Sequence, residues 1–586
     1  MLKTLKAQVK QYKWVSIITP VFSALEAVAD MILPFFMAKI IDYGVKGDGG
    51  MPAILKYGGL MLAVALGALL CGILAARFAS IASTGFATNL RDAMFTNIQT
   101  FSFSNIDRFS TAGLVTRLTT DVSNLQMSYQ MLLRICVRAP TMLVAALILS
   151  FSIHSELSLV FVVAIAFLIL ALSFVIANAT KHFNRVFRKY DDLNESVQEN
   201  VSAIRVVKAY VREDFEGKKF KKASENVRRL LMRAEMILAW NAPLMQLTVY
   251  SCILLISWLG AQLIVSSGAT AFTTGDLMSM LSYCMNILMS LMMLSTVFVM
   301  ITMSAASAKR VAEVLDEQSD LTNGEDPVME VRDGSVKFDH VSFAYKKDGE
   351  KALEDIDLDI KSGETIGIIG GTGSAKSSLV QLLPRLYDVT EGSVTIGGVD
   401  VRRYDLDTLR NNVAMVLQKN ELFSGTIAEN LRWGNPDATD AEIEDACKQA
   451  CADEFIERFP DKYQTHIEQG GNNVSGGQKQ RLCIARALLK KPRILILDDS
   501  TSAVDTATDA KIRHSFAEKI PGTTVFIIAQ RISSVENADK VLVLDNGRVS
   551  GFDTPANLLK TNAIYQDVYN SQTKGSGDFD EKGGEA

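Results

Sequence analysis

Hydrophobic and polar positions divide the chain into two regions with different patterns. Up to about Met303 the sequence holds six long apolar stretches, whereas the remainder alternates short apolar runs with Gly, Asp and Lys. A bilayer core needs about 20 apolar residues in helical form, and short alternating runs are typical of soluble α/β domains. The pattern therefore predicts an α-helical membrane domain with six transmembrane helices, fused to an α/β domain.

The six apolar stretches are the candidate membrane spans. They lie near residues 15–41, 54–79, 137–151, 157–179, 243–265 and 277–301. The first follows four lysines, as a signal peptide would, but it has no small-residue cleavage site, and we expect a retained anchor. Six spans place both ends of the chain on one side of the membrane.

Two long loops, 80–136 and 180–242, carry many arginines and lysines, whereas the other loops are short and poor in them. The positive-inside bias makes the long loops cytoplasmic. Both loops show helical periodicity, so we expect helices that continue past the membrane. Residues 109–113 interrupt the first, residues 206–210 lie near the middle of the second, and both are candidate contacts to the soluble domain.

The composition shifts set the expected domain boundaries. The transmembrane domain covers 1–316, a polar linker covers 317–334, and the α/β domain covers 335–570. Residues 571–586 are rich in Gly, Asp, Glu and Lys without periodicity, which predicts a disordered tail. The net charge of −5 gives no support for a nucleic-acid partner, and the seven cysteines form no C-x-x-C pair.

Two acidic residues stand inside the first span. Glu26 and Asp30 are four apart and share one helix face, where buried acids are costly. One interpretation is a cation-attracting or proton-coupled site. The other, which we favour, is a pair that faces water or a donor on a partner helix.

A phosphate-binding loop follows the strand predicted at 366–370. The sequence Gly370-Gly-Thr-Gly-Ser-Ala-Lys-Ser-Ser378 matches G-x-x-x-x-G-K-[ST] except at Ala375. Such loops direct backbone N–H groups at phosphates, while the lysine adds charge and the next hydroxyl binds Mg²⁺. Lys376 and Ser377 receive these roles. If residue 375 needs a positive φ, alanine adds about 1 kcal/mol of strain relative to glycine.

The segment Val474-Ser-Gly-Gly-Gln-Lys-Gln-Arg481 lies about a hundred residues further on. Here the chain resembles the ATP-binding cassette transporters, whose L-S-G-G-Q signature caps ATP held by the opposite subunit. Spans followed by one cassette resemble the exporter branch, the type IV fold. The resemblance implies that Ser475, Gly476, Gly477 and Gln478 act on a partner's ATP.

The resemblance also assigns the remaining motif residues. It implies that Tyr345 stacks on adenine, that Ser502–Asp505 link the two sites, and that the acid Asp498 orients Mg²⁺ with Ser377 and Gln418. The expected ATP-binding residues are Tyr345, Gly370, Gly371, Thr372, Gly373, Ser374, Ala375, Lys376, Ser377, Ser378 and Gln418.

Three departures fall on catalytic or site-communicating positions. Asp499 stands where the family carries a catalytic glutamate, and Gln530 replaces the switch histidine that contacts the γ-phosphate. The segment 468–471, Glu-Gln-Gly-Gly, departs from the usual G-E-x-G. Aspartate is one methylene shorter than glutamate, and an error of about 1 Å can lower a rate about 100-fold. The departures resemble one half of heterodimeric exporters with a degenerate ATP site.

The sequence therefore predicts one half of a heterodimeric exporter of amphipathic, multidrug or lipid-like compounds. Its cofactors are ATP and Mg²⁺, and its partner is a second half-transporter that supplies the glutamate and histidine. We expect a multi-pass cell-membrane protein with the cassette and both termini in the cytoplasm. The rivals are a homodimeric exporter with slow hydrolysis and an ATP-gated regulatory membrane protein.

Overall fold

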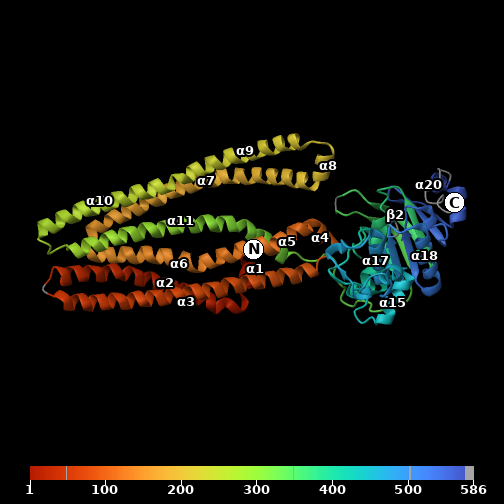
Figure 1. Cartoon of the computed structure of the whole chain (residues 1–586), viewed down its shortest axis with the longest axis horizontal. Helices are drawn as coiled ribbons and strands as arrows, with labels where there is room; N and C mark the ends of the chain where they lie inside the picture. Colours follow the sequence, from red (N-terminus) through yellow and green to blue (C-terminus); the bar gives the residue numbers. More distant parts are fainter. Residues whose placement is uncertain (48, 347–348, 501–502, 574–586) are drawn as a thin grey trace. The chain divides into compact units, whose positions relative to one another are not determined.

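The chain forms two compact units in the computed structural model, which describes residues 1–573 apart from 48, 347–348 and 501–502 (Figure 1). The first unit comprises Met1–Gln99 and Thr111–Glu317. The second comprises Thr100–Ser110 and the chain from Gln318 onward. The short segment 100–110, which we expected in the membrane domain, therefore groups with the cassette.

The first unit is built from helices. They are α1 (Leu2–Ala7), η1 (Lys10–Tyr12), α2 (Lys13–Lys39), η2 (Ile40–Val45), α3 (Gly50–Gln99), α5 (Thr111–Thr116), η3 (Arg117–Asp121), α6 (Val122–Ile153), α7 (Ser155–Ser202), α8 (Ile204–Ala209), α9 (Glu213–Ala239), α10 (Asn241–Ser267) and α11 (Thr274–Asp316). Within the described residues, six helical stretches are long and apolar enough to cross a membrane. The predicted six-span membrane domain is confirmed.

Small residues allow α3 to approach α2 closely. A Cβ atom at Gly85 would lie 2.2 Å from the ring of Tyr12, and one at Gly72 would lie 2.9 Å from Glu26 Oε1. Ala75 and Ala79 of α3 are also fully buried. Membrane helices gain little from hydrophobic burial against each other, so close backbone approach through small residues is a main source of their association.

The predicted cytoplasmic helices are present. α7 extends to Ser202 and lies beside α9 (Figure 1). The two are joined by α8, which occupies most of the predicted contact element 206–210. Val206, Tyr210 and Val211 are exposed there, and Val211 has a φ of 51°. The turn thus presents an apolar surface at the end of the helical pair.

An arginine on α6 compensates the two acids of the first span. Arg138 Nη1 lies 2.7 Å from Glu26 Oε1, and its Nη2 lies 2.8 Å from Asp30 Oδ2. Glu26 is buried, while about a quarter of the Arg138 and Asp30 side chains is exposed. The structure matches the interpretation of a donor on a partner helix, and sequence reasoning had not identified Arg138 as that donor.

Two sheets form the framework of the second unit. A six-stranded sheet has the order β12-β11-β3-β10-β9-β6, in which all neighbours are parallel except β12 with β11. A four-stranded antiparallel sheet has the order β2-β1-β4-β5, and β7 pairs with β8. The strands are β1 (Val336–Phe343), β2 (Leu353–Ile360), β3 (Thr365–Gly370), β4 (Glu391–Ile396), β5 (Val399–Asp400), β6 (Val413–Val416), β7 (Gly425–Thr426), β8 (His466–Ile467), β9 (Ile494–Asp498), β10 (Thr524–Ile528), β11 (Lys540–Asp545) and β12 (Arg548–Asp553).

Helices cover the parallel sheet, whose central strands are buried along their length. The helices of the second unit are α4 (Phe103–Phe109), α12 (Lys376–Gln381), η4 (Val401–Arg403), α13 (Leu406–Asn412), α14 (Ile427–Arg432), α15 (Asp440–Gln449), α16 (Asp453–Ile456), η5 (Lys462–Gln464), η6 (Gln469–Gly471), α17 (Gly476–Leu488), α18 (Thr506–Lys519), η7 (Ile532–Ser534), α19 (Pro555–Thr561) and α20 (Ala563–Thr573). β9 and β10 are buried at every position, as expected for a parallel sheet covered on both faces.

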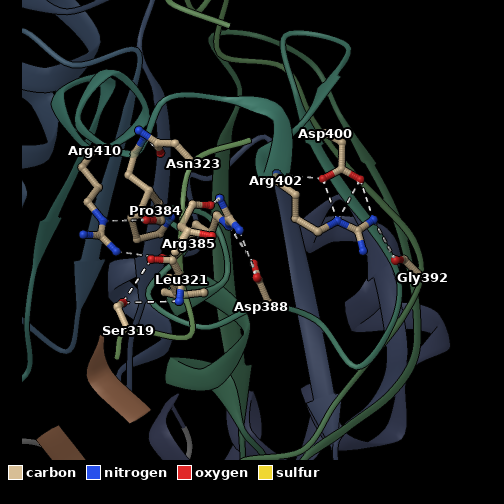
Figure 2. Close-up of polar contacts among 12 residues, drawn as sticks. Ser319, Leu321, Asn323, Pro384, Arg385, Asp388, Gly392, Asp400, Arg402 and Arg410 are labelled. Atoms are coloured by element: carbon tan, nitrogen blue, oxygen red, sulfur yellow. Dashed lines mark hydrogen bonds and ion pairs between the residues drawn. The ribbon is translucent and has the colours of Figure 1, made fainter. Parts of the chain in front are cut away.

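The polar segment 317–334 is held against the cassette rather than free of it. Asn323 Nδ2 donates to Asp405 Oδ1 at 2.6 Å, and Arg385 Nη1 donates to the Thr322 carbonyl at 3.3 Å. Figure 2 shows Asn323, Leu321 and Arg385 together, and Leu321 is buried. The expected linker is therefore part of the cassette surface from Gln318 onward.

Two arginines fix the chain that follows α12. Arg385 is buried with a φ of 49°, and its Nε lies 2.7 Å from Asp388 Oδ1. Arg410 donates to the carbonyls of Pro384 and Arg385 at 3.3 and 3.0 Å (Figure 2). Charged hydrogen bonds to a buried backbone hold this turn in one conformation, and with it the adjoining Tyr387.

We expect Arg138→Gln to destabilise the membrane domain by about 2 kcal/mol, because Glu26 and Asp30 would lose their shared donor. The expectation allows for the exposed part of the cluster. Thermal unfolding in detergent measures the change. Arg134→Gln, one helical turn away, is the matched control, and a triple variant with Glu26→Gln and Asp30→Asn should recover most of the loss. Equal melting of the Arg138 and Arg134 variants would contradict a stabilising role.

Candidate functional site

The predicted site residues gather at the carboxyl edge of the parallel sheet. β10 lies between β3 and β9, and its Ile528 is level with Ile368 on one side and Asp498 on the other. Gly370 ends β3, Asp498 ends β9, and Gln530 follows β10 by two residues. Strands that run parallel end at the same edge, so three distant segments of the sequence meet there.

The loop between β3 and α12 has a conformation that requires small residues. Gly370 has a φ of 155°, and a Cβ atom there would lie 2.2 Å from the Leu544 carbonyl oxygen. Gly373 has a φ of 85°, and Ala375 has a φ of 66° in the left-handed region. The position at which the sequence departs from the glycine pattern is therefore one where glycine would be favoured.

Lys376 is the first residue of α12, and its side chain contacts this loop. Its Nζ donates to the carbonyls of Gly370 and Gly371, both at 2.8 Å, and to Ser374 Oγ at 3.3 Å. Burial lowers the pKa of Lys376, and the carboxylates of Asp498 and Asp499 oppose that shift. A phosphate in the loop would favour the charged ammonium in the same way, by placing negative charge beside it.

Ser377 and Asp498 supply paired oxygen ligands. Ser377 Oγ donates to Asp498 Oδ1 at 3.0 Å, and Asp498 is almost fully buried at the end of β9. Burial raises the pKa of Asp498, and the neighbouring charge of Asp499 adds to the shift. A hydroxyl and a carboxylate side by side are a donor set that suits Mg²⁺, which usually keeps waters and phosphate oxygens as its other ligands.

Asp499 and Gln530, the two residues that depart from the expected pattern at catalytic positions, contact each other. Gln530 Nε2 donates to Asp499 Oδ2 at 2.7 Å, and Gln418 Nε2 lies 3.4 Å from the same oxygen. Asp499 has a φ of 48°, and its N–H donates to the Ile528 carbonyl at 3.1 Å. Residues that were predicted separately, at 418, 499 and 530, therefore form one hydrogen-bonded group.

A cavity of about 950 Å³ contains these groups. It is lined by the whole loop 370–378, by Tyr345 and Gln418, and by the group around Asp499. Val568, Ser571 and Gln572 of α20 also line it. Sequence reasoning missed α20 and placed Ser571 and Gln572 in the tail, whereas the helix continues to Thr573; residues 574–586 lie outside the described residues.

Tyr345 is half-exposed at this cavity, where its ring is available for stacking. Its hydroxyl lies 2.8 Å from Ser378 Oγ, and its ring meets that of Tyr387 edge to face at 5.3 Å. The Tyr387 hydroxyl donates to Asp107 of α4 at 2.7 Å, and Phe103 of α4 packs on the same ring. Burial and the Asp107 carboxylate raise the pKa of Tyr387.

The Ser475–Gln478 segment begins α17 and does not line this cavity among the described residues. Ser475 Oγ accepts from the Gln478 N–H at 3.3 Å, and Gln478 Oε1 accepts from the Ser475 N–H at 2.8 Å. Ser475 and Gly476 are exposed. The segment is therefore a capped helix start with exposed residues.

The two other motif segments adopt tight turns. Gly470 and Gly471 have φ values of 72° and 66°, so both glycines of the Glu-Gln-Gly-Gly segment occupy the left-handed region. Ser502 lies outside the described residues. Beyond it, Ala503 N–H donates to Gln480 Oε1 at 3.0 Å, and Asp505 caps α18. The signature helix is thereby tied to the segment after β9.

Comparison with known proteins identifies both units. Residues 16–292 match the family described as ABC transporter transmembrane region, and residues 353–502 match that described as ABC transporter. The chain is 35% identical over 564 residues to YfiB of Bacillus subtilis (strain 168), an uncharacterized ABC transporter ATP-binding protein, covering 96% of this chain and 97% of the relative. It is 34% identical over 431 residues to YheI of the same organism, a probable multidrug resistance ABC transporter ATP-binding/permease protein, covering 74% and 73%.

A solved structure shares the fold. A bacterial Atm1-family ABC exporter with ATP bound aligns with a TM-score of 0.82 at 24% identity, covering 96% of this chain and 99% of that one. The likeness extends over the membrane unit and the cassette together. It agrees with the exporter-type, six-span arrangement expected from the sequence.

We expect Ala375→Gly to raise the free energy of unfolding by about 1 kcal/mol, because glycine adopts the left-handed conformation of residue 375 without a Cβ clash. Thermal unfolding with and without ATP provides the measurement. Ala510→Gly, at an exposed position within α18, is the matched control and should lower stability by about 1 kcal/mol. Loss of stability in both variants would show that residue 375 carries no backbone strain.

Proposed function

The chain belongs to the ABC transporter family, and we propose that it is one half of a heterodimeric exporter with a degenerate ATP site. The observation that carries the proposal is the contact between Asp499 and Gln530. The Asp499 carboxylate, already one methylene short of a glutamate, is engaged by the Gln530 amide at 2.7 Å. A carboxylate held in this way is a poor base for the water that attacks ATP.

Gln530 adds a second deficit. A histidine at the switch position can gain and lose a proton near neutral pH, whereas a glutamine amide cannot. Lys376, Ser377, Asp498 and Gln418 remain suited to hold ATP and Mg²⁺. Mg²⁺, when bound, neutralises phosphate charge and orients the leaving group. The site keeps the residues for binding and lacks those for fast hydrolysis.

The exposed signature segment supports a two-chain assembly. Ser475–Gln478 is formed and capped, yet among the residues that the structure describes it does not line this chain's cavity. In the proposed dimer it completes the ATP site of a partner that carries the catalytic glutamate and histidine. ATP held by this chain favours the closed dimer through many cycles. Hydrolysis at the partner's site reopens the dimer and drives alternating access.

The transported compound is inferred from the membrane unit and from a relative. The relative YheI is named as a probable multidrug resistance transporter, and the six candidate spans are long and apolar. We therefore propose amphipathic multidrug or lipid-like substrates. The basic cytoplasmic loops orient the protein with its cassette and both termini in the cytoplasm.

We expect the double variant Asp499→Glu with Gln530→His to raise hydrolysis at this chain's site by about 10- to 100-fold in the purified complex, since it restores the base and removes the amide that engages it. The partner's glutamate is replaced by glutamine in the same complex, so that the remaining ATPase activity reports this site alone. Asp499→Glu by itself should gain less, because Gln530 remains. If Asp499→Ala abolished all hydrolysis in the otherwise native complex, Asp499 would be the main catalyst.

Affinity purification of the tagged chain from its native membrane should yield a second, different half-transporter in equal amount. The purified pair should accumulate substrate in inverted vesicles with ATP, at a rate well above that of this chain alone. A stable homodimer with substrate-stimulated ATPase would support the homodimeric exporter. Nucleotide binding without accumulation against a gradient would instead support an ATP-gated membrane protein.

A further inference from the structure

We propose that Gln572, on the C-terminal helix α20, is a positioning residue that holds the switch segment of the nucleotide site. The inference rests on the proposed function only in taking the loop cavity as an ATP site. It concerns Gln530–Ile532, the short connection between β10 and the helical turn η7.

Gln572 makes two hydrogen bonds to the backbone of this connection. Its Nε2 donates to the Gln530 carbonyl at 2.8 Å, and its Oε1 accepts from the Ile532 N–H at 2.8 Å. One side-chain amide thus uses both its donor and its acceptor and spans Arg531. A single orientation of the amide satisfies both groups, so the pairing is specific for Gln or Asn chemistry.

The two hydrogen bonds of Gln572 lie just beyond the last backbone hydrogen bond between β10 and its neighbour β3. The last sheet contact of this segment is from the Ala529 N–H to the Ile368 carbonyl at 3.2 Å. The turn η7 begins at Ile532, whose carbonyl accepts from the N–H of Val535 at 2.9 Å. Gln530 and Arg531 form the link between these two ordered parts. Gln572 forms one hydrogen bond at each end of this link.

α20 is itself firmly attached to the cassette. Tyr565 of α20 is almost fully buried, and its N–H donates to Asn562 Oδ1 at 2.9 Å. Asn562 Nδ2 in turn donates to the Ser550 carbonyl on β12 at 3.1 Å. Val568 packs against the same core and lines the nucleotide cavity one helical turn before Gln572. The helix can therefore transmit its position to the switch segment.

A fixed backbone at Gln530 limits the positions that the Gln530 side chain can occupy. That side chain donates to Asp499 at 2.7 Å, so the chain of contacts runs from α20 through Gln572 and Gln530 to the catalytic position. Gln530 lines the cavity together with Asp498, Asp499 and the phosphate-binding loop. Gln572 is thus expected to govern how long this chain retains ATP, and to affect ADP less.

Hydrogen exchange tests the contact directly in the purified, full-length complex. Gln572→Ala should increase exchange of the Ile532 amide about fivefold, the loss expected for one hydrogen bond. Gln572→Glu keeps an acceptor for Ile532 but cannot donate to Gln530, so it should preserve protection of Ile532. Gln566→Ala is the matched control, because Gln566 lies on the same helix and donates to the Leu559 carbonyl instead.

Nucleotide retention tests the consequence. Photolabelling with azido-ATP and azido-ADP, followed by separation of the two chains, reports the nucleotide held by this chain alone. Gln572→Ala and Gln572→Glu should both shorten ATP retention about fivefold and leave ADP retention nearly unchanged. A merely structural role of Gln572 would shorten both equally, which would overturn the inference.

The outcome is separable from that of the proposed function. Unchanged exchange at Ile532 in Gln572→Ala, as in Gln566→Ala, would refute the positioning role even in a confirmed heterodimeric exporter. Conversely, a homodimer would refute the heterodimer proposal while leaving the exchange and retention results interpretable. If Gln572→Ala does not fold, Gln572→Glu still decides the role through its ATP-to-ADP ratio.

Discussion

The parallel pairing of β10 between β3 and β9 is the constraint on which the nucleotide site depends. Because Ile528 is level with both Ile368 and Asp498, the loop after β3, the two acids at the end of β9 and the switch residue after β10 must meet at one edge. A shift of one strand by a single residue would turn its buried side chains to the opposite face. Because β9 and β10 are buried on both faces, such a shift would exchange the side chains that pack on each face, and close packing opposes that exchange. The register of three hydrophobic strands thus places residues separated by more than 150 positions.

Much of this site could be predicted from the sequence because its residues follow strand ends in short, recognisable motifs. The six spans and the α/β cassette were equally clear from hydrophobic length and alternation. Arg138, Gln572 and the contact of Asp107 with Tyr387 were not found, because each depends on one partner far away in the sequence and no local pattern marks it. Gln572 lies in a polar stretch whose composition is typical of a disordered tail. Only the packing of Tyr565 and Val568 reveals that the helix is fixed.

The membrane unit and the cassette differ in how their buried charged side chains are compensated. In the membrane unit, one guanidinium pairs with two carboxylates on the neighbouring helix, which lowers the formal charge from −2 for the two acids to −1 for the cluster. In the cassette, Asp498 is buried and Lys376 is partly buried, and desolvation shifts the pKa of each toward its neutral form. In the first arrangement the opposite charges meet within the protein. The second is poised to gain stability when ligands of opposite charge arrive, which is the usual property of a binding site.

Because residues 100–110 belong to the cassette unit, they determine where one transporter's cassette can be exchanged for another's. Two membrane-unit segments flank α4, yet Phe103 and Asp107 contact Tyr387 and group with the cassette. A cassette exchanged between transporters at the boundary near residue 317 would leave its own α4 behind and inherit a foreign one. Functional chimeras would therefore need three crossover points, one on either side of α4 and one before Gln318. The folded cassette unit is therefore built from two separate segments of the sequence, and both would have to be transferred together.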